Sequence, residues 1–389
     1  MSGVSTEAAA AARPVSRTLW EHRDAVPETA DAVDRLSPVS QAALRQLSPE
    51  RMTAYGVDPA DAIDLRGRVV EGEDWQATAT ELAERLLARA AVSGAAVPPT
   101  PVTRVGLLRR SSALLRMSQM MMLEDTDERR EIYRRSAGLY AEAAALTGDR
   151  ERVVLDSAAG TVVGWLIPAA QPVAAAIVIG GVEGWAFDFD SVGEALAVRG
   201  VSALMLDAPG QGETRFGHGT YLTSGWRAAY DSAATFLQRD GDLPLGLVGN
   251  SMGGSFVIAY AAGDPRVRAC CDNGGAPQPW TVTPEYGTFF WKMAAACGTA
   301  DADRAIATWR SVTPETRGPH RDYDLLVVHG ARDPMVSQEM VDEIVADAAA
   351  RRIDVHTFSD GVHCVYNHRA DRDDLIADWM LAALQPAVG

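Results

Sequence analysis

The spacing of hydrophobic and polar positions changes near residue 150. Before this point, apolar residues recur at the three- and four-residue spacing of amphipathic helices, as over residues 75–91, 105–122 and 129–145. A proline-rich stretch at residues 97–101 interrupts the pattern and predicts a turn. Because each helix must bury its apolar face, we expect an N-terminal helical domain over residues 1–150.

From Glu151 onward, short apolar runs alternate with helical segments. Strands are expected at residues 153–155, 162–167, 173–179, 201–206, 243–248, 267–271, 325–329 and 354–358. Helices are expected at about residues 192–198, 225–238 and 251–262. Such alternation is typical of a mostly parallel sheet with helices on both faces. The predicted fold class is therefore α/β, with the sheet domain over residues 151–389.

One interval, at about residues 276–320, does not follow this alternation. It is rich in aromatic residues, namely Trp280, Tyr286, Phe289, Phe290, Trp291 and Trp309. A helical insertion here forms either an extra structural layer or the wall of a substrate pocket, and the sequence leaves both readings open.

The motif Gly-Asn-Ser-Met-Gly at residues 249–253 lies between an expected strand and an expected helix. This is the context of a nucleophile elbow, where a serine stands on a strained turn with its hydroxyl above the sheet. The flanking glycines allow neighbouring backbone to approach closely. The alternative reading of Ser251 is an ordinary serine at a helix N-terminus.

A nucleophilic serine needs a general base, which in turn needs an acid to orient it. In α/β hydrolases the chain order is serine, acid, histidine. Asp333 follows the strand expected at residues 325–329, and His363 follows the last expected strand. We therefore predict Ser251, Asp333 and His363 as a catalytic triad.

Three other residues compete for the roles of acid and base. Asp360 lies too close to the predicted histidine on the same loop, and His368 lies near the terminal helix. His329 lies within an expected strand, where a packed, hydrogen-bonded core histidine is the expected role.

The mechanism also needs two donors for the oxyanion. The Met252 amide follows the serine at the start of a helix, and the Val182 amide lies in the glycine-rich loop at residues 180–184. We predict both as the oxyanion hole. For the loop, a glycine turn without a catalytic role is the alternative.

Three motifs carry a resemblance to a known family. They are Asp-Ala-Pro-Gly-Gln-Gly-Glu-Thr at residues 207–214, the glycine–serine motif at 249–254 and Gly-Ala-Arg-Asp at 330–333. The chain resembles α/β hydrolases of the 2,6-dihydroxypseudooxynicotine hydrolase group, together with the fermentation–respiration-switch-like esterases and the fungal pigment chain-shortening hydrolases. The helical run at residues 109–146 resembles the N-terminal helical region of that group.

The resemblance implies a helical cap over the active site, commonly in a homodimer. It also implies hydrolysis of an ester or of a carbon–carbon bond next to a ketone. The carbon–carbon hydrolases of the group use an acidic cap residue, for which Glu285 is the candidate. The group often has G-x-D-x-x-K-E after its third strand, whereas residues 181–187 read Gly-Val-Glu-Gly-Trp-Ala-Phe, which implies a different substrate. Asp207 and Glu213 are expected to hold backbone.

Candidate pocket residues come from the glycine-rich loop and from the insertion. They are Glu183, Trp185, Glu285, Tyr286 and Phe290. The aromatic members suggest a bulky small-molecule substrate, aromatic or polyketide-like in character.

Charge narrows the set of partners. The chain has 36 basic and 52 acidic residues and a net charge of −16, which argues against nucleic acid or an anionic membrane but allows a local basic pocket. We expect substrate selection to rest on an apolar pocket rather than on long-range attraction of an anion. Lys292 is the only lysine, and codon bias in a GC-rich genome is the simplest explanation for the excess of arginine.

The remaining composition predicts a cytoplasmic enzyme without a metal or cofactor. Its cysteines, at positions 270, 271, 297 and 364, have neither metal-ligand spacing nor a disulfide pattern. The N-terminal sequence lacks the features of a secretory leader, and no apolar run approaches the ~20 residues of a membrane helix.

The sequence thus predicts a serine hydrolase that forms an acyl-enzyme with a bulky small molecule. A lyase, cyclase or acyltransferase that uses the same triad is the first rival. A binding module that has lost catalysis is the second, although the intact triad argues against it.

Overall fold

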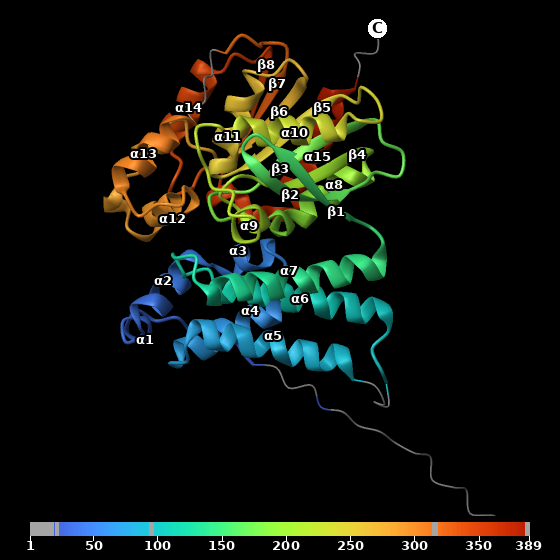
Figure 1. Ribbon diagram of the computed structural model, residues 1–389. Coiled ribbons are helices and arrows are strands. Elements are labelled where there is room, and N and C mark those ends of the chain that lie inside the picture. The colour runs from blue at the N-terminus through green and yellow to red at the C-terminus, as the bar shows by residue number, and fades with distance from the viewer. Residues whose placement is uncertain (1–18, 20–22, 93–96, 313–317, 386–389) are drawn as a thin grey trace, which may run out of the picture.

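The computed structural model describes residues 19, 23–92, 97–312 and 318–385. The elements between residues 30 and 147 of the described chain are helices, and a sheet with further helices follows (Figure 1). The N-terminal segment considered for a leader lies outside the described residues, apart from Leu19. Within the described ranges, no helix combines the length and apolarity that a membrane crossing requires.

The N-terminal region is helical, as expected. Its elements are α1 (Ala30–Val33), α2 (Pro38–Gln46), α3 (Pro49–Ala54), α4 (Pro59–Val70), α5 (Trp75–Ala91), α6 (Pro101–Ser118) and α7 (Asp127–Thr147). Helix α6 begins earlier than the apolar spacing predicts, because Thr100 caps its first turn and Pro101 fits the first helical position. Gly148 ends α7 in the left-handed conformation, with φ 65°.

The sheet begins at Glu151. Its strands are β1 (Glu151–Ser157), β2 (Gly160–Ile167), β3 (Ala174–Ile179), β4 (Val201–Asp207), β5 (Leu245–Asn250), β6 (Val267–Asn273), β7 (Asp324–Gly330) and β8 (Arg352–Phe358). They pair in the order β1-β2-β4-β3-β5-β6-β7-β8. Strand β2 is antiparallel to β1 and β4, and the other pairs are parallel. The predicted α/β fold is confirmed.

Side chains of the central strands alternate between two hydrophobic layers. In β7, Leu325 and Val327 pack with helices α10 (Arg227–Leu237), α11 (Met252–Ala261) and α14 (Gln338–Asp347). Leu326 and Val328 join the layer of α8 (Asp190–Val198) and α15 (Arg369–Leu384). Both faces are therefore covered, which explains why the strand sequences are almost continuously apolar.

The aromatic-rich interval forms a helical insertion between β6 and β7. Its described elements are η2 (Pro279–Thr281), η3 (Pro284–Tyr286), α12 (Thr288–Ala296) and α13 (Ala302–Arg310). Trp309 is buried in the layer that covers one face of the sheet, and Phe290 packs in a small cluster of the insertion itself. These two residues thus follow the structural reading of the insertion.

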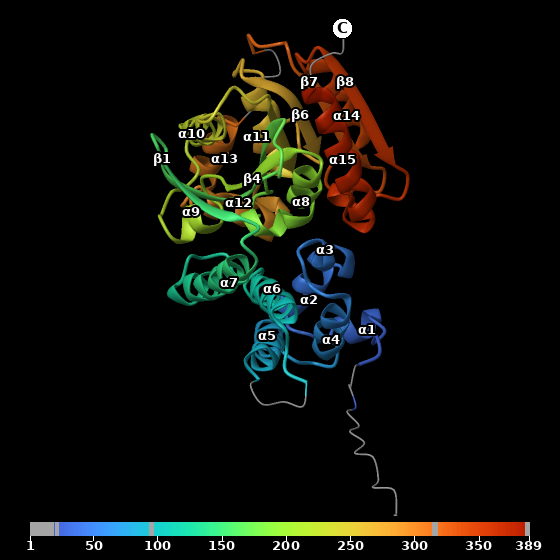
Figure 2. The ribbon, with the colours of Figure 1, turned by 90° about the vertical axis from the view of Figure 1, so that its right-hand side faces the viewer.

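The N-terminal helices gather at one end of the sheet, as two views at right angles show (Figures 1 and 2). They have their own hydrophobic core, which also takes in Cys364 and Tyr366 from the short helix η4 (His363–His368) after β8. Tyr133 and Tyr140 of α7 pack in the layer of α8 and α15. The helical region therefore packs directly against the loops that leave the sheet.

Candidate active site

Ser251 stands on the sharp turn between β5 and α11. Its backbone has φ 54° and ψ −131°, a conformation that a non-glycine residue adopts at a cost. A Cβ at Gly249 would lie 2.3 Å from the Gly253 oxygen, and one at Gly253 would lie 2.6 Å from the Gly180 oxygen. The glycines of the motif are thus required for the tight packing that supports the strained serine.

Ser251, His363 and Asp333 are linked by short hydrogen bonds. The Ser251 Oγ lies 2.9 Å from His363 Nε2, and His363 Nδ1 lies 2.8 Å from Asp333 Oδ2. Asp333 Oδ1 accepts hydrogen bonds from the amides of Met335 and Val336 at 2.8 and 3.1 Å. Although the segments are far apart in the sequence, the fold brings the three side chains into one chain of contacts.

The electrostatics of this group favour an ionised acid beside a basic imidazole. Burial disfavours the carboxylate form of Asp333, but hydrogen bonds from His363 and two amides outweigh it and lower its pKa. Burial also disfavours the imidazolium form of His363. The Cys364 sulfur and the Asp333 carboxylate favour that form, and the net effect raises the pKa of His363.

The three competing residues lie elsewhere. His329 is buried within β7, and its Nδ1 has no partner among the described residues. This agrees with a core position, and the Nδ1 atom does not make the expected hydrogen bond. His368 Nε2 lies 2.8 Å from Asp360 Oδ1 in a separate pair that is largely exposed.

Two backbone amides lie beside Ser251. Met252 is the first residue of α11, so its amide has no acceptor within the helix. A Cβ at Gly181 would lie 3.0 Å from Ser251 Cβ, which places the glycine-rich loop directly against the serine. The next amide in this loop, that of Val182, donates no hydrogen bond to another described residue. Both amides can therefore donate to an oxygen bound at this point.

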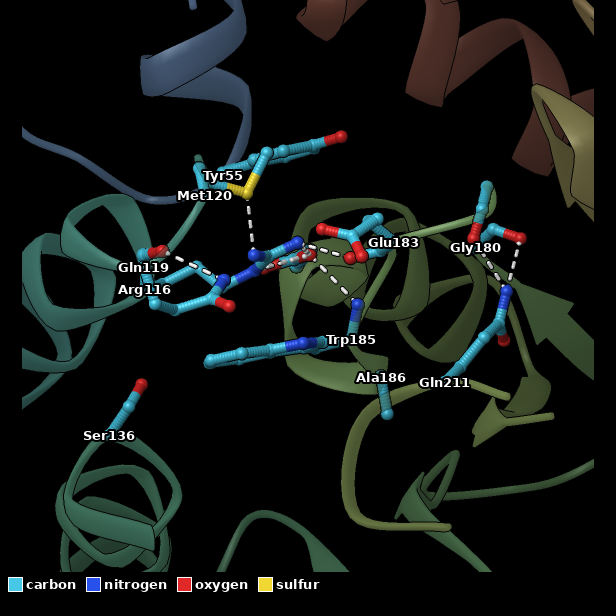
Figure 3. A network of polar contacts seen from close by, with 12 residues as sticks. Tyr55, Arg116, Gln119, Met120, Ser136, Gly180, Glu183, Trp185, Ala186 and Gln211 are labelled. Carbon is cyan, nitrogen blue, oxygen red and sulfur yellow. Dashed lines mark hydrogen bonds and ion pairs between the residues drawn. The ribbon is translucent and has the colours of Figure 1, made fainter. Parts of the chain in front are cut away.

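The Gln211 side chain fixes the glycine-rich loop, a role that the sequence analysis did not foresee. Its Nε2 donates to the carbonyl oxygens of Gly180 at 2.9 Å and Gly181 at 2.6 Å. Its Oε1 accepts from the Ala208 amide at 3.0 Å. Figure 3 shows this glutamine reaching the loop from the segment after β4. The signal was present in the sequence, since Gln211 lies in the motif that carries the family resemblance.

Asp207 holds two further segments, as expected. Its carboxylate accepts from the amides of Ala186 at 2.6 Å and Glu213 at 2.7 Å. Burial raises the pKa of Asp207 to about 7, against the opposing effect of these amides. The Glu213 side chain instead pairs with Arg152 of β1.

Buried ion pairs join the helical region to the glycine-rich loop. Arg116 of α6 pairs with Asp188 at 3.1 Å and donates to the Glu183 carbonyl (Figure 3). Arg129 of α7 contacts the Glu183 carboxylate at 2.9 Å, and Arg215 lies 3.6 Å from it. Burial acts to raise the pKa of Glu183, but the surrounding cations prevail and lower it to about 2. This glutamate is therefore ionised.

A cavity of about 340 Å³ contains Ser251 and His363. Its lining comes from three parts of the chain: the N-terminal helices, the loops at the end of the sheet and the insertion. The lining residues are Gln46, Arg51, Tyr55, Gly181, Val182, Glu183, Gly184, Ser251, Tyr286, Thr288, Phe289, Lys292, Met335, His363 and Tyr366. The helical region thus supplies part of the wall around the serine.

The candidate pocket residues divide into two groups. Glu183 and Tyr286 line the cavity. Trp185 does not, because its ring packs against Arg116 and α7, and Phe290 is buried inside the insertion. Glu285 is exposed and is not among the lining residues. The lining residues that the insertion contributes are Tyr286, Thr288, Phe289 and Lys292.

Several lining residues were not foreseen, among them four from the N-terminal helices and the insertion. Gln46, Arg51 and Tyr55 come from α2, from α3 and from the end of α3, and no local motif marks them. Lys292 of α12 had a visible signal as the only lysine, which the sequence analysis assigned to codon bias. The cavity is also less apolar than expected, because Lys292 and Arg51 both line it.

Comparison with known proteins finds similarity to α/β hydrolases. A family model described as "Hydrolase_4: Serine aminopeptidase, S33" matches residues 170–278. The chain is 27% identical over 272 residues to 2,6-dihydropseudooxynicotine hydrolase of Paenarthrobacter nicotinovorans, covering 66% of this chain and 72% of that protein.

Solved structures extend the likeness to the helical region. The crystal structure of the 2,6-dihydroxy-pseudo-oxynicotine hydrolase superposes with a TM-score of 0.73 at 22% identity, covering 86% of this chain and 95% of that one. AbyA5 superposes with a TM-score of 0.64 at 15% identity, covering 80% and 90%. The resemblance noted from the motifs is thus confirmed. The protein is an enzyme of the α/β-hydrolase type, with helices preceding the sheet.

Proposed function

We propose that this enzyme is a serine hydrolase that cleaves an ester bond, or a carbon–carbon bond next to a ketone, in a bulky small molecule. The observation that carries the proposal is the chain of hydrogen bonds from Ser251 through His363 to Asp333. Similarity to a named small-molecule hydrolase supports it.

In the proposed first half-reaction, Ser251 Oγ attacks the substrate carbonyl carbon while His363 Nε2 accepts its proton. Asp333 holds His363 Nδ1–H and stabilises the imidazolium that forms. The amides of Met252 and Val182 donate to the oxyanion of the tetrahedral intermediate. The Val182 amide donates to no other described residue, and Val182 lines the same cavity as Ser251, which supports this assignment.

The leaving group then departs with the proton held on His363. For an ester the leaving group is an alcohol, and for a ketone-adjacent carbon–carbon bond it is an enolate that the proton neutralises. Glu183 lines the cavity but is held as a carboxylate by its arginine neighbours, so His363 is the proton donor in this scheme. Water activated by His363 finally releases the acyl group from Ser251.

The helical region acts as a cap domain in this proposal. It would comprise residues 1–150, with residues 151–389 as the catalytic domain and the insertion at about 276–320. Arg51 and Tyr55 support the assignment because they line the same cavity as Ser251. A homodimer and a cytoplasmic location belong to the same proposal. Light scattering of the purified protein tests the homodimer, and fractionation of cells tests the location.

The test compares Ser251→Ala with Ser255→Ala on panels of nitrophenyl esters and β-diketones. Ser255 lies on the same helix, but its hydroxyl donates to the Ala276 carbonyl at 2.6 Å and does not line the cavity. We expect the first variant to lose about a thousandfold or more in kcat. We expect the second to keep most of its activity. Equal activity of both variants would contradict the proposal.

Hydrolysis also makes a prediction about water. In water enriched in heavy oxygen, the released acid gains one labelled oxygen for each acyl-enzyme that water resolves. A product without label would contradict hydrolysis and favour a lyase, cyclase or acyltransferase reaction.

A further inference from the structure

Lys292 is a buried cation that faces the same cavity as Ser251. It lies on α12, its exposed fraction is 5%, and it lines the cavity. Its Nζ donates to Gln46 Oε1 at 3.3 Å. An ammonium group has three donors, so this single contact with a neutral oxygen leaves most of its capacity free within the described part of the chain.

Other buried cations are paired differently. Within the described ranges, each buried arginine has a carboxylate within 3.1 Å: these are Arg66, Arg116, Arg129, Arg150, Arg215 and Arg372. By contrast, no carboxylate of the described residues lies within 4.0 Å of the Lys292 ammonium. The buried arginines that join parts of the protein are therefore paired in direct contact, whereas the ammonium of Lys292 has only the more distant Glu183 carboxylate, which Arg129 already binds.

Arg51 of α3 adds a second positive charge to this wall. It donates to the Gln46 carbonyl at 3.0 Å and to the Tyr55 hydroxyl at 3.3 Å, and its buried Nε has no partner among the described residues. The nearby Glu183 carboxylate is already bound by Arg129 at 2.9 Å. We call Lys292 and Arg51 together the cationic wall of the cavity.

A buried cation that no anion contacts directly is unfavourable unless a ligand supplies that contact. We propose that the substrate of the Ser251 site carries an anionic oxygen group, a carboxylate or an ionised enol, which binds to Lys292 and Arg51. This inference rests on the proposed function and specifies its substrate class. The cavity, at about 340 Å³, lets one small molecule reach both the serine and the cationic wall.

The overall charge of −16 does not conflict with this assignment. Long-range attraction of an anion is not needed, because the two cations act at contact distance inside the cavity. The assignment replaces the expectation that an apolar pocket alone selects the substrate.

The test measures binding rather than turnover, by calorimetry on Ser251→Ala protein. Ligands are aliphatic and aryl carboxylates with their matched amides, and acidic phenols with their methyl ethers. We expect the best anions to bind about tenfold or more tightly than their neutral partners. The two ligand arms distinguish a carboxylate from an enol-like oxygen.

Variants assign the effect to the cationic wall. Lys292→Met should remove most of the preference for anions, while Lys292→Arg should keep it and Arg51→Met should reduce it. Arg104→Met, an exposed change outside the cavity, is the control. Circular dichroism checks that each variant is folded.

The outcomes separate this inference from the proposed function. Equal binding of anions and neutral partners, or an unchanged preference in Lys292→Met, would overturn the inference. If anions bind as expected but Ser251 proves dispensable for catalysis, the proposed function fails and the anion site stands.

Discussion

Arg116 and Asp188 form a buried ion pair, with 3.1 Å between Nη2 and Oδ2, that joins helix α6 to the segment after β3. Both side chains are almost completely buried. Arg116 also donates to the Glu183 carbonyl, one residue beyond the proposed oxyanion donor Val182. The helical region therefore helps to set the position of the loop that faces Ser251.

Replacing Arg116 with Met should destabilise the protein strongly. The change leaves the Asp188 carboxylate buried without its cation, and we expect the free energy of unfolding to fall by about 3–5 kcal/mol. Urea denaturation measures the loss. Arg104→Met breaks an exposed pair with Glu142 and should cost less than about 1 kcal/mol. Similar losses in the two variants would show that the buried pair has no special role.

Replacing Gln211 with Leu should lower kcat more than it changes KM. The variant loses the donor that holds the Gly180 and Gly181 carbonyls, so the loop amide moves relative to Ser251. A small misplacement of a catalytic group costs up to about a hundredfold, and we expect a loss of tenfold to a hundredfold in kcat. Steady-state kinetics measures kcat and KM of this variant, with Gln338→Leu, a change at an exposed glutamine, as the control. A change confined to KM would refute the positioning role.

Replacing Asp333 with Asn should reduce kcat by about 10³- to 10⁴-fold, because the amide favours the wrong imidazole tautomer of His363. The chain offers a matched control in Asp360→Asn, which disrupts the other histidine–aspartate pair, with His368. The control should keep nearly full activity. Comparable losses in both variants would mean that Asp333 has no privileged role.

The preference for anionic ligands should fall as the pH rises through about 8. Burial lowers the pKa of Lys292 to about 8; Arg51, Arg129 and Arg116 also lower it, and Glu183 opposes them. Below this pH the ammonium is charged and binds anions, and above it the neutral amine does not. The ratio of anion to neutral-ligand affinity measures the effect, since it cancels changes common to both ligands. Lys292→Arg should give a ratio that does not change between pH 7 and 9, and a flat wild-type ratio would contradict the assignment.

Much of the fold follows from local patterns that can be read in the sequence. Helix α5 agrees with its predicted bounds, and the strands appear where short apolar runs were found, within a few residues. The proximity of Ser251, Asp333 and His363 could also be predicted, because each lies in the segment that follows a recognisable strand. The bounds of α6 shifted because a cap and a proline, rather than apolar spacing, define its start.

The wall of the cavity could not be predicted in the same way. Arg51 and Tyr55 line the cavity of Ser251 only because the helical region packs on the sheet, and nothing in their local sequence indicates that position. Trp185 and Phe290 have the aromatic character of pocket residues but are used for packing. The direction in which a side chain points depends on tertiary contacts, and the pattern of neighbouring residues in the sequence does not reveal those contacts.

The most direct test of the account is covalent trapping of the nucleophile. Wild-type protein is treated with an active-serine fluorophosphonate, and peptide mapping by mass spectrometry locates the adduct. The account predicts one phosphonylated residue, Ser251, with slow labelling in His363→Ala and no adduct at this position in Ser251→Ala. The central claim would be contradicted if the reagent abolished the activity of the wild-type enzyme by modifying another residue while Ser251 remained unmodified.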